Sequence, residues 1–366
     1  MFANRRLWLG IAVTGGFLLL LLLRVDFSEM GSAFLNANYA YLLPGIAVYF
    51  VALYIRAIRW RYVLRPFART RANRLFPVVL IGYMANNLLP VRMGELARSY
   101  YLSTREPVRG STALATIIVE RVFDGLVMLL LLVVAAFFLP VLGLAERVGS
   151  ATGLPEWALG TLVVLPFVSV LGMMIVIAVY PAVFRQFALN LSQRLPDSVG
   201  LRAYGLVERF IAGFTGLQKP SRLAAVFALS LPIWLVEGLM YYIIAVGFGL
   251  HDQVGGFAEL GIVMIAFTAV ANLATSIPSS QGSIGPFEFF SAMALTFLGV
   301  TSGVASAYVI VLHAALLLPV IGIGMVYLAT QSLSLGQLTR IPRHQETVGP
   351  EASPASSRGT QQKESP

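Results

Sequence analysis

Cysteine is absent from this chain of 366 residues, and charged residues make up only 12% of it. Without cysteine the chain has no disulfide, no thiolate metal ligand and no cysteine nucleophile. Its three histidines are scattered and lack metal-ligand spacing. No GxxxxGK[ST] motif for ATP occurs, so active transport would need an ion gradient or a partner. We therefore predict neither a metal nor an organic cofactor.

Hydrophobic residues, by contrast, form 57% of the chain, and the mean hydropathy is +0.79. Both values are far above those of soluble globular proteins. The net charge of +9 does not indicate nucleic-acid binding, because the arginines cluster between apolar runs, where membrane insertion itself places them. The composition predicts an all-α polytopic membrane protein.

The apolar runs have lengths that suit membrane crossing, for which about 20 mostly apolar residues are needed. Candidate spans lie at about 7–24, 41–58, 112–139, 158–180, 222–248 and 302–330. The first resembles a signal peptide, but no small-x-small cleavage site directly follows Leu23, so we interpret it as a retained span. Two further segments, Leu75–Leu89 and Leu260–Leu298, are too broken to be ordinary spans. We predict about six spanning helices and two re-entrant helical hairpins.

The arginines predict how these segments are oriented. The second span is followed by seven cations with no acid among them, which predicts a cytoplasmic loop: Arg56, Arg59, Arg61, Arg65, Arg69, Arg71 and Arg74. The chain that follows the first broken segment is also positive, with Arg98, Arg105 and Arg109, which predicts that it too lies on the cytoplasmic face. That segment is therefore predicted to enter and leave from the cytoplasm, and the second to enter from outside.

The order of span, re-entrant hairpin and span in both halves predicts an inverted repeat, in which substrates bind near the midplane where broken helices meet. The predicted transmembrane domain is 1–339, with repeats at about 41–139 and 222–330 and a cytoplasmic amphipathic segment at about 183–221. A tail at 340–366, rich in Ser, Pro, Gln and Glu, is expected to be disordered. Both termini are expected in the cytoplasm of a plasma-membrane protein.

The segment NNLLPVRMGELARSYY combines helix breakers with ionisable residues beside apolar runs. Pro90 and Gly94 allow a turn that leaves backbone amides free, and free amides at a helix start attract anions. Arg92 and Arg98 suit a phosphate. Alternatively, both arginines only snorkel to lipid phosphates. The predicted headgroup-binding residues here are Asn86, Asn87, Arg92, Glu95, which holds a guanidinium or binds an amine, and Arg98.

The motif VERVFDG places Glu120, Arg121 and Asp124 well inside the third counted span. Glu120 and Asp124 share a helix face, and Arg121 can pair with Asp124 one turn on. A structural ion pair and a proton-coupled carboxylate are equally compatible with this pattern.

The second broken segment contains SIPSSQGSIGPFE, in which Pro278 and Pro286 are the predicted helix breakers. Its hydroxyls, amides and glycines suit a phosphate or sugar, although the glycines also suit close helix packing. The predicted headgroup-binding residues here are Ser279, Gln281, Gly282, Gly285 and Glu288. Glu237 and His313 are interpreted as satisfied contacts between helices.

Four motifs, RAIRWRYVL, NNLLPVRMGELAR, VERVFDG and IPSSQGSIGPFE, occur in this order. Through them the chain resembles the flippase-like or lysylphosphatidylglycerol synthase transmembrane-region family over about residues 5 to 332. That family often has a Gly-Gly pair near the fourth motif, where this chain has Gln281-Gly282-Ser283.

The resemblance implies a role like that of the membrane half of the multiple peptide resistance factor, which moves aminoacylated phospholipid across the membrane. It also implies kinship with proteins linked to polyprenyl-linked sugar and hopanoid pathways. Because no synthetase domain follows the membrane part, we expect a stand-alone transport module without aminoacyl transfer activity.

The leading hypothesis is therefore a non-enzymatic lipid translocase, flippase- or scramblase-like, that passes a phospholipid or polyprenyl-phosphate-linked headgroup through a polar cavity. Its expected partners are membrane lipids and enzymes of envelope lipid or glycan synthesis. The first rival is a membrane-embedded glycosyltransferase or other lipid-modifying enzyme, although the loop after the first span offers only Asp26 and Glu29 as acids. The second rival is a non-transporting regulator of envelope lipid synthesis.

Overall fold

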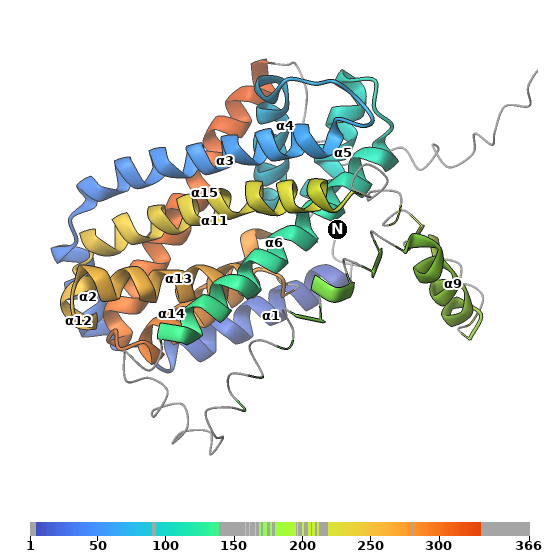
Figure 1. Cartoon of the computed structure of the whole chain (residues 1–366). Coiled ribbons are helices and arrows are strands. Elements are labelled where there is room, and N and C mark those ends of the chain that lie inside the picture. Colours follow the sequence, from blue (N-terminus) through green and yellow to red (C-terminus); the bar gives the residue numbers. More distant parts are fainter. Residues whose placement is uncertain are drawn as a thin grey trace, which may run out of the picture.

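A computed structural model describes residues 5–89, 93–138, 180–194, 219–277, 279 and 281–330, with single residues and short groups between 158 and 211. Within this part of the chain the secondary structure is helical, without a strand (Figure 1). Pro90, Arg92 and Pro278 lie outside the described residues, as do most of the predicted span 158–180 and the whole tail 340–366. The all-α class is confirmed.

Several helices have the length and apolar composition of membrane spans. Four qualify singly, Tyr39–Leu64, Ser221–Gly247, Phe257–Ala274 and Ser302–Thr330, and a bent pair, Gly10–Leu22 with Phe27–Asn36, raises the number to as many as five. Large apolar side chains on these helices face outward, as Leu43 and Leu318 do with 77% and 66% exposure. The chain is therefore a polytopic membrane protein.

The N-terminal run predicted as one span at 7–24 is helix α1, Arg5–Leu22, followed by α2, Phe27–Asn36, at an angle of 92°. Asp26 caps α2 by accepting a hydrogen bond from the amide of Glu29. α1 packs on α14, Pro286–Phe297, and α2 packs on α15, Ser302–Thr330. The N-terminal helices therefore cover the second half of the molecule.

The first half consists of α3, Leu42–Leu64, after a short 3₁₀ turn η1, Tyr39–Tyr41, then α4, Ala72–Leu88, α5, Gly94–Arg105, and α6, Gly110–Phe138. α4 and α5 pack against each other as a hairpin. They approach closely because Gly94 has no side chain: a Cβ there would collide with the carbonyl oxygen of Gly82 and with Asn86. The broken segment predicted at Leu75–Leu89 is thus the first limb of a tight hairpin.

The second half repeats this order. It consists of α11, Pro220–Gly247, a short α12, Leu250–Val254, α13, Phe257–Ala274, a 3₁₀ turn η4, Gln281–Ser283, α14, Pro286–Phe297, and α15, Ser302–Thr330. α13 and α14 form the second hairpin. Gly285, at φ +97°, ends its tip, and Pro286 begins the return helix. Between the halves, α9 spans Pro181–Ser192 and overlaps the start of the amphipathic segment predicted at about 183–221.

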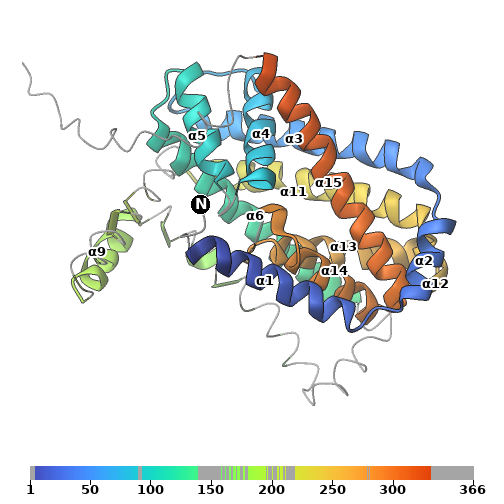
Figure 2. The same cartoon turned by 180° about the vertical axis from the view of Figure 1, so that it is seen from behind.

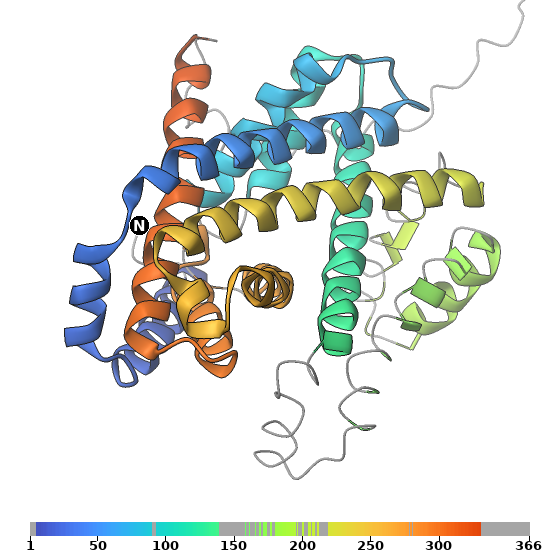
Figure 3. The same cartoon turned by 60° about the vertical axis from the view of Figure 1, so that its left-hand side comes forward.

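The contacts between the halves follow the pattern of an inverted repeat. α3 and α11 lie side by side and run in opposite directions (Figures 1 and 3). α4 of the first hairpin packs on α15, and α13 of the second hairpin packs on α6. The hairpins come from opposite ends of the bundle, and α4 meets η4 at the tip of the second hairpin (Figure 2). The end of α4 and the tip of the second hairpin therefore meet inside the molecule.

One prediction about the first half was wrong. We expected the second span to end near residue 58 and Arg56 and Arg59 to lie in a cytoplasmic loop, but α3 continues to Leu64. Arg56 is 2% exposed and Arg59 is fully buried. The positive-inside rule counts charges without knowing their partners, and here acids from α6 and α11 pair with both cations inside the bundle.

Candidate functional site

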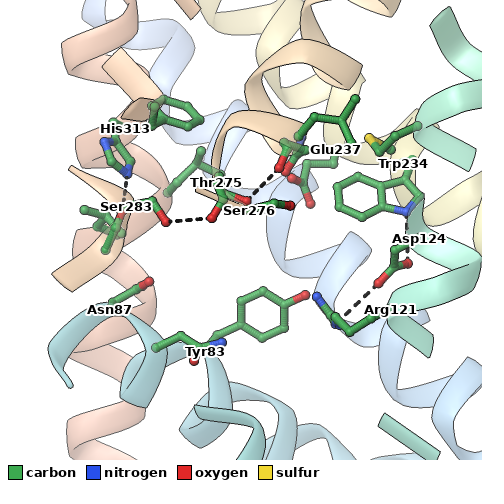
Figure 4. A pocket seen from close by; sticks show the side chains of 18 of the residues that line it. Tyr83, Asn87, Arg121, Asp124, Trp234, Glu237, Thr275, Ser276, Ser283 and His313 are labelled. Carbon is green, nitrogen blue, oxygen red and sulfur yellow. Dashed lines mark hydrogen bonds and ion pairs between the residues drawn. The ribbon is translucent and has the colours of Figure 1, made fainter. Parts of the chain in front are cut away.

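A cavity of about 490 Å³ lies where the end of α4 meets the tip of the second hairpin (Figure 4). Helices of both halves line it, with Arg56 of α3, Asn87 of α4, Glu95 of α5, Arg121 of α6, Glu237 of α11, Asn272 of α13, Phe287 of α14 and His313 of α15. Tyr83 and Asn87 lie on one side, opposite Thr275, Ser276 and Ser283 on the other. Polar side chains in a bundle of apolar helices mark a pathway or binding site.

Beside the cavity, five charged side chains of three helices form a buried cluster that we call the Arg59 cluster: Arg59, Arg98, Glu120, Arg121 and Asp124. Arg59 lies 2.5 Å from Asp124 and 3.3 Å from Glu120. Arg98 lies 2.8 Å from the other oxygen of Glu120. The proximity of opposite charges offsets the large desolvation cost that each charge would carry alone, although the Arg98–Glu120 contact is an ion pair without a hydrogen bond.

The Arg59 cluster carries one more cation than it has acids. Arg59 and Arg98 are almost fully buried behind their partners, whereas the Arg121 side chain is 39% exposed and lies 3.4 Å from Asp124. Asp124 also accepts hydrogen bonds from Arg59 and from the indole of Trp234. Its charge is therefore shared, and Arg121 is the cation of the cluster that faces the cavity, where the Glu95 carboxylate also acts on it (Figure 4).

A second polar chain crosses the cavity wall from α3 to α13. Arg56 lies 2.7 Å from Glu237, which also accepts a hydrogen bond of 2.8 Å from the hydroxyl of Tyr241. The amide of Asn272 donates in turn to Tyr241. The Arg56 guanidinium also stacks over Trp234, 4.6 Å from the ring centroid. This chain ties α3, α11 and α13 together and is formally neutral.

The tip of the second hairpin is held by a histidine and a glutamate. His313 Nδ1 lies 2.5 Å from Glu288, and His313 Nε2 lies 3.0 Å from the carbonyl oxygen of Gly282. The other oxygen of Glu288 accepts a hydrogen bond of 2.7 Å from the amide of Gly285. The pair thus fastens η4 and the start of α14 to α15.

The tip of the first hairpin has a matching arrangement. The side-chain oxygen of Asn86 accepts a hydrogen bond of 2.7 Å from the amide of Gly94, and its nitrogen donates to Glu95. We expected free amides at this break to attract an anion. The Gly94 amide is instead occupied by Asn86, and the corresponding amide of the second hairpin, that of Gly285, is occupied by Glu288.

The predicted site residues fall into three groups. Asn86, Asn87, Glu95, Arg121, Asp124 and Gly282 line the cavity. The second group is buried among its partners and consists of Arg98, Glu120 and Glu288; the Arg98 guanidinium lies 3.6 Å from the Trp60 ring centroid. The third group lies near the second tip without lining the cavity and consists of Ser279, Gln281, Gly285 and Pro286. Arg92 lies outside the residues that the structure describes.

Sequence reasoning missed several cavity residues. Arg56 was assigned to a loop, and Trp234 and Tyr241 were not assigned to the headgroup site. Glu237 and His313 were predicted to be satisfied contacts between helices; they are, and they also line the cavity. The spacing of Arg56 and Arg59, three residues apart before Trp60, was the available signal, because it places both guanidinium groups on one helix side.

Comparison with known families identifies the chain. The family model for the lysylphosphatidylglycerol synthase transmembrane region matches residues 7–324. The chain belongs to this family. Its match covers both halves and both hairpins, so the cavity lies entirely within the family's region.

Relatives of the chain include several archaeal proteins. The chain is 26% identical to "Glycosyltransferase AglD" of Haloferax volcanii over 324 residues, which cover 83% of this chain but only 51% of that relative. It is 24% and 25% identical to two proteins named "UPF0104 membrane protein" of Methanothermobacter thermautotrophicus, covering 77% and 75% of this chain and 83% and 78% of those relatives. The chain thus spans about half the length of the first relative. No solved structure matches.

Proposed function

We propose that this protein is a lipid translocase of the plasma membrane, in which a lipid headgroup passes through the cavity between the hairpin tips while its hydrocarbon tails stay in the bilayer. The observation that supports this most strongly is the cavity itself, a polar space of about 490 Å³ inside apolar helices. Both hairpin tips border it, as expected for a site reached alternately from two sides.

The charges suggest how a headgroup is held. Arg121 is the cation of the Arg59 cluster that faces the cavity, and its guanidinium can grip a phosphate with two parallel hydrogen bonds. Asn87, Asn272 and Ser283 line the same space and offer donors and acceptors to hydroxyl or amine groups. This chemistry fits a phospholipid or a polyprenyl-phosphate-linked sugar. In this proposal Arg121 takes the phosphate-binding role that the sequence suggested for Arg92 and Arg98, of which Arg92 lies outside the described residues and Arg98 is buried against Glu120.

A leaflet-exchange assay tests the proposal. The protein is reconstituted into vesicles containing fluorescent phosphatidylglycerol, and dithionite bleaches the outer leaflet only. The wild type should make inner-leaflet probe accessible, and Arg121→Gln should slow this severalfold. Arg61→Gln, which removes an exposed cation outside the cavity, is the matched control and should leave the rate unchanged. Equal rates for wild type and protein-free vesicles would overturn translocation of this lipid.

A second function, lipid-linked sugar transfer, is favoured by the name of one relative, a glycosyltransferase. Three carboxylates line the cavity, Glu95, Asp124 and Glu237, and the last two are paired with arginines. Glu95 and Glu237 would therefore serve such a reaction together only if Arg56 released Glu237. Incubation of the purified protein with a polyprenyl-phosphate sugar and an acceptor lipid tests it by mass spectrometry. A product that is lost in Glu237→Gln supports transfer, and a complete lack of product leaves translocation as the better account.

A further inference from the structure

A second, smaller hollow of about 190 Å³ lies beside the cavity, between α6, α11 and α13. We call it the side groove; its walls include Leu131, Leu235, Leu239, Gly261 and Ile265. Leu235 and Leu239 are 53% and 46% exposed, so the groove opens on the outer surface of the bundle. Both α11 and α13 have the composition of membrane spans, which places this surface toward lipid.

The side groove offers nothing to a polar ligand. Its polar side chains are already engaged: the Thr268 hydroxyl donates to the carbonyl of Met264, and the Tyr242 hydroxyl donates to that of Phe257. The Trp234 indole donates to Asp124 on the cavity side. The rest of the wall is aliphatic, apart from Gly238 and Gly261. Only a hydrocarbon occupant gains from such a surface.

Trp234 lines both the side groove and the cavity. It belongs to an apolar cluster with Met128 and Leu131, of which Met128 faces the cavity and Leu131 the groove. A single layer of side chains therefore separates the polar space from the lipid-facing groove. On the cavity side the indole donates to Asp124 and its ring lies under the Arg56 guanidinium, as aromatic side chains with polar contacts do at polar boundaries.

We propose that the side groove binds a hydrocarbon chain of the lipid whose headgroup occupies the cavity, with Trp234 as the wall that the headgroup passes on entering or leaving. This inference rests on the proposed translocation for the identity of that lipid. It assigns to the face of α6, α11 and α13 the role of a lateral entrance from the bilayer.

Gly261 provides a substitution that fills the side groove with little risk to folding. A Cβ at this position meets no atom within 4 Å, so a larger side chain has space to extend into the groove. Gly322 on α15 has equally open surroundings but lies away from the groove. Gly261→Leu and Gly322→Leu are therefore matched, and Gly261→Ala gives an intermediate degree of filling. Equal thermal unfolding of the three proteins establishes that they are folded.

Phosphatidylcholine that is brominated on its acyl chains quenches tryptophan fluorescence on contact, so quenching of Trp234 reports directly whether an acyl chain occupies the side groove. The chain has four tryptophans, so the Trp234 contribution is the difference between each protein and its Trp234→Phe counterpart. In wild type and Gly322→Leu the Trp234 signal should be quenched strongly; in Gly261→Leu most of this quenching should be lost, with Gly261→Ala between. Quenching of Trp234 that is the same in Gly261→Leu and wild type would overturn the proposal.

Leaflet exchange measured on the same variants separates this inference from the proposed function. If hydrocarbon enters the groove during translocation, Gly261→Leu should exchange lipid severalfold more slowly than Gly322→Leu. A wild type without exchange activity but with Trp234 quenching that depends on Gly261 would overturn translocation and leave the hydrocarbon site standing. Active exchange that is unaffected by Gly261→Leu would show that the groove is not on the lipid's path.

Discussion

The two hairpins occupy equivalent places in the fold but are fastened by different chemistry. In each, a side chain accepts a hydrogen bond from the amide at the start of the return helix: Asn86 from Gly94, and Glu288 from Gly285. The first return helix is tied to α6 by Arg98 and Glu120, where the arginine is always charged.

The second return helix is tied to α15 by Glu288 and His313. His313 also contacts the carbonyl oxygen of Gly282, so one side chain holds both the turn and the return helix of this hairpin. The comparison teaches that the first hairpin is anchored along its return helix by a buried ion pair, whereas the second is fastened at its tip.

The largest effect is expected when the buried Arg98–Glu120 pair is broken. Glu120→Gln leaves the Arg98 guanidinium buried without an acid and weakens the hold on Arg59. Removing one member of a buried ion pair typically costs about 3–5 kcal/mol, so the unfolding temperature of the purified protein should fall sharply. Arg121→Gln, at the exposed edge of the same cluster, is the control and should unfold close to wild type. Equal unfolding temperatures for Glu120→Gln and wild type would contradict the anchoring role.

A smaller effect is expected at the second hairpin. His313→Gln removes the contact with Glu288 and weakens the hold on Gly282. A hydrogen bond to a charged partner is worth about 1.5–3 kcal/mol, which is less than the loss expected for Glu120→Gln. Hydrogen exchange should show faster opening of α14 than of α5 in this variant. Faster opening of α5 instead would reverse the assignment of the two anchors.

A third effect is expected from packing within the first hairpin. Gly94→Ala adds a methyl group that collides with the Gly82 carbonyl and Asn86, and overpacking of this kind costs about 1–3 kcal/mol. Gly16→Ala on α1, where a Cβ meets nothing within 4 Å, is the control and should not destabilise the protein. The unfolding temperatures of the two variants are compared. Equal unfolding temperatures would show that the contact between α4 and α5 can relax to accommodate the methyl group.

Much of the fold could be predicted from the sequence, because long apolar runs and helix breakers are local signals. The runs at 41–58, 222–248 and 302–330 correspond to α3, α11 and α15, and the two broken segments became the two hairpins. The hairpins were predictable because Pro, Gly and ionisable residues interrupt apolar sequence at both places.

The partners of the charged residues could not be predicted, because they come from distant parts of the chain. Arg59 pairs with Glu120 and Asp124, which follow it by 61 and 65 residues, and Arg56 pairs with Glu237, 181 residues away. Local rules therefore assigned both arginines to a loop. The pairing of Arg121 with Asp124 was predicted correctly, because three residues of helix bring them together.

The most direct test of the central claim, that headgroups pass between the hairpin tips, uses the absence of cysteine from the chain. Asn87→Cys and Ser283→Cys each place a single thiol in the cavity wall, and Leu318→Cys places one on the outer surface. Reaction with a bulky charged methanethiosulfonate should stop leaflet exchange in the two cavity variants, and reduction should restore it, while Leu318→Cys stays active throughout. Undiminished exchange with both cavity thiols fully modified would contradict the account.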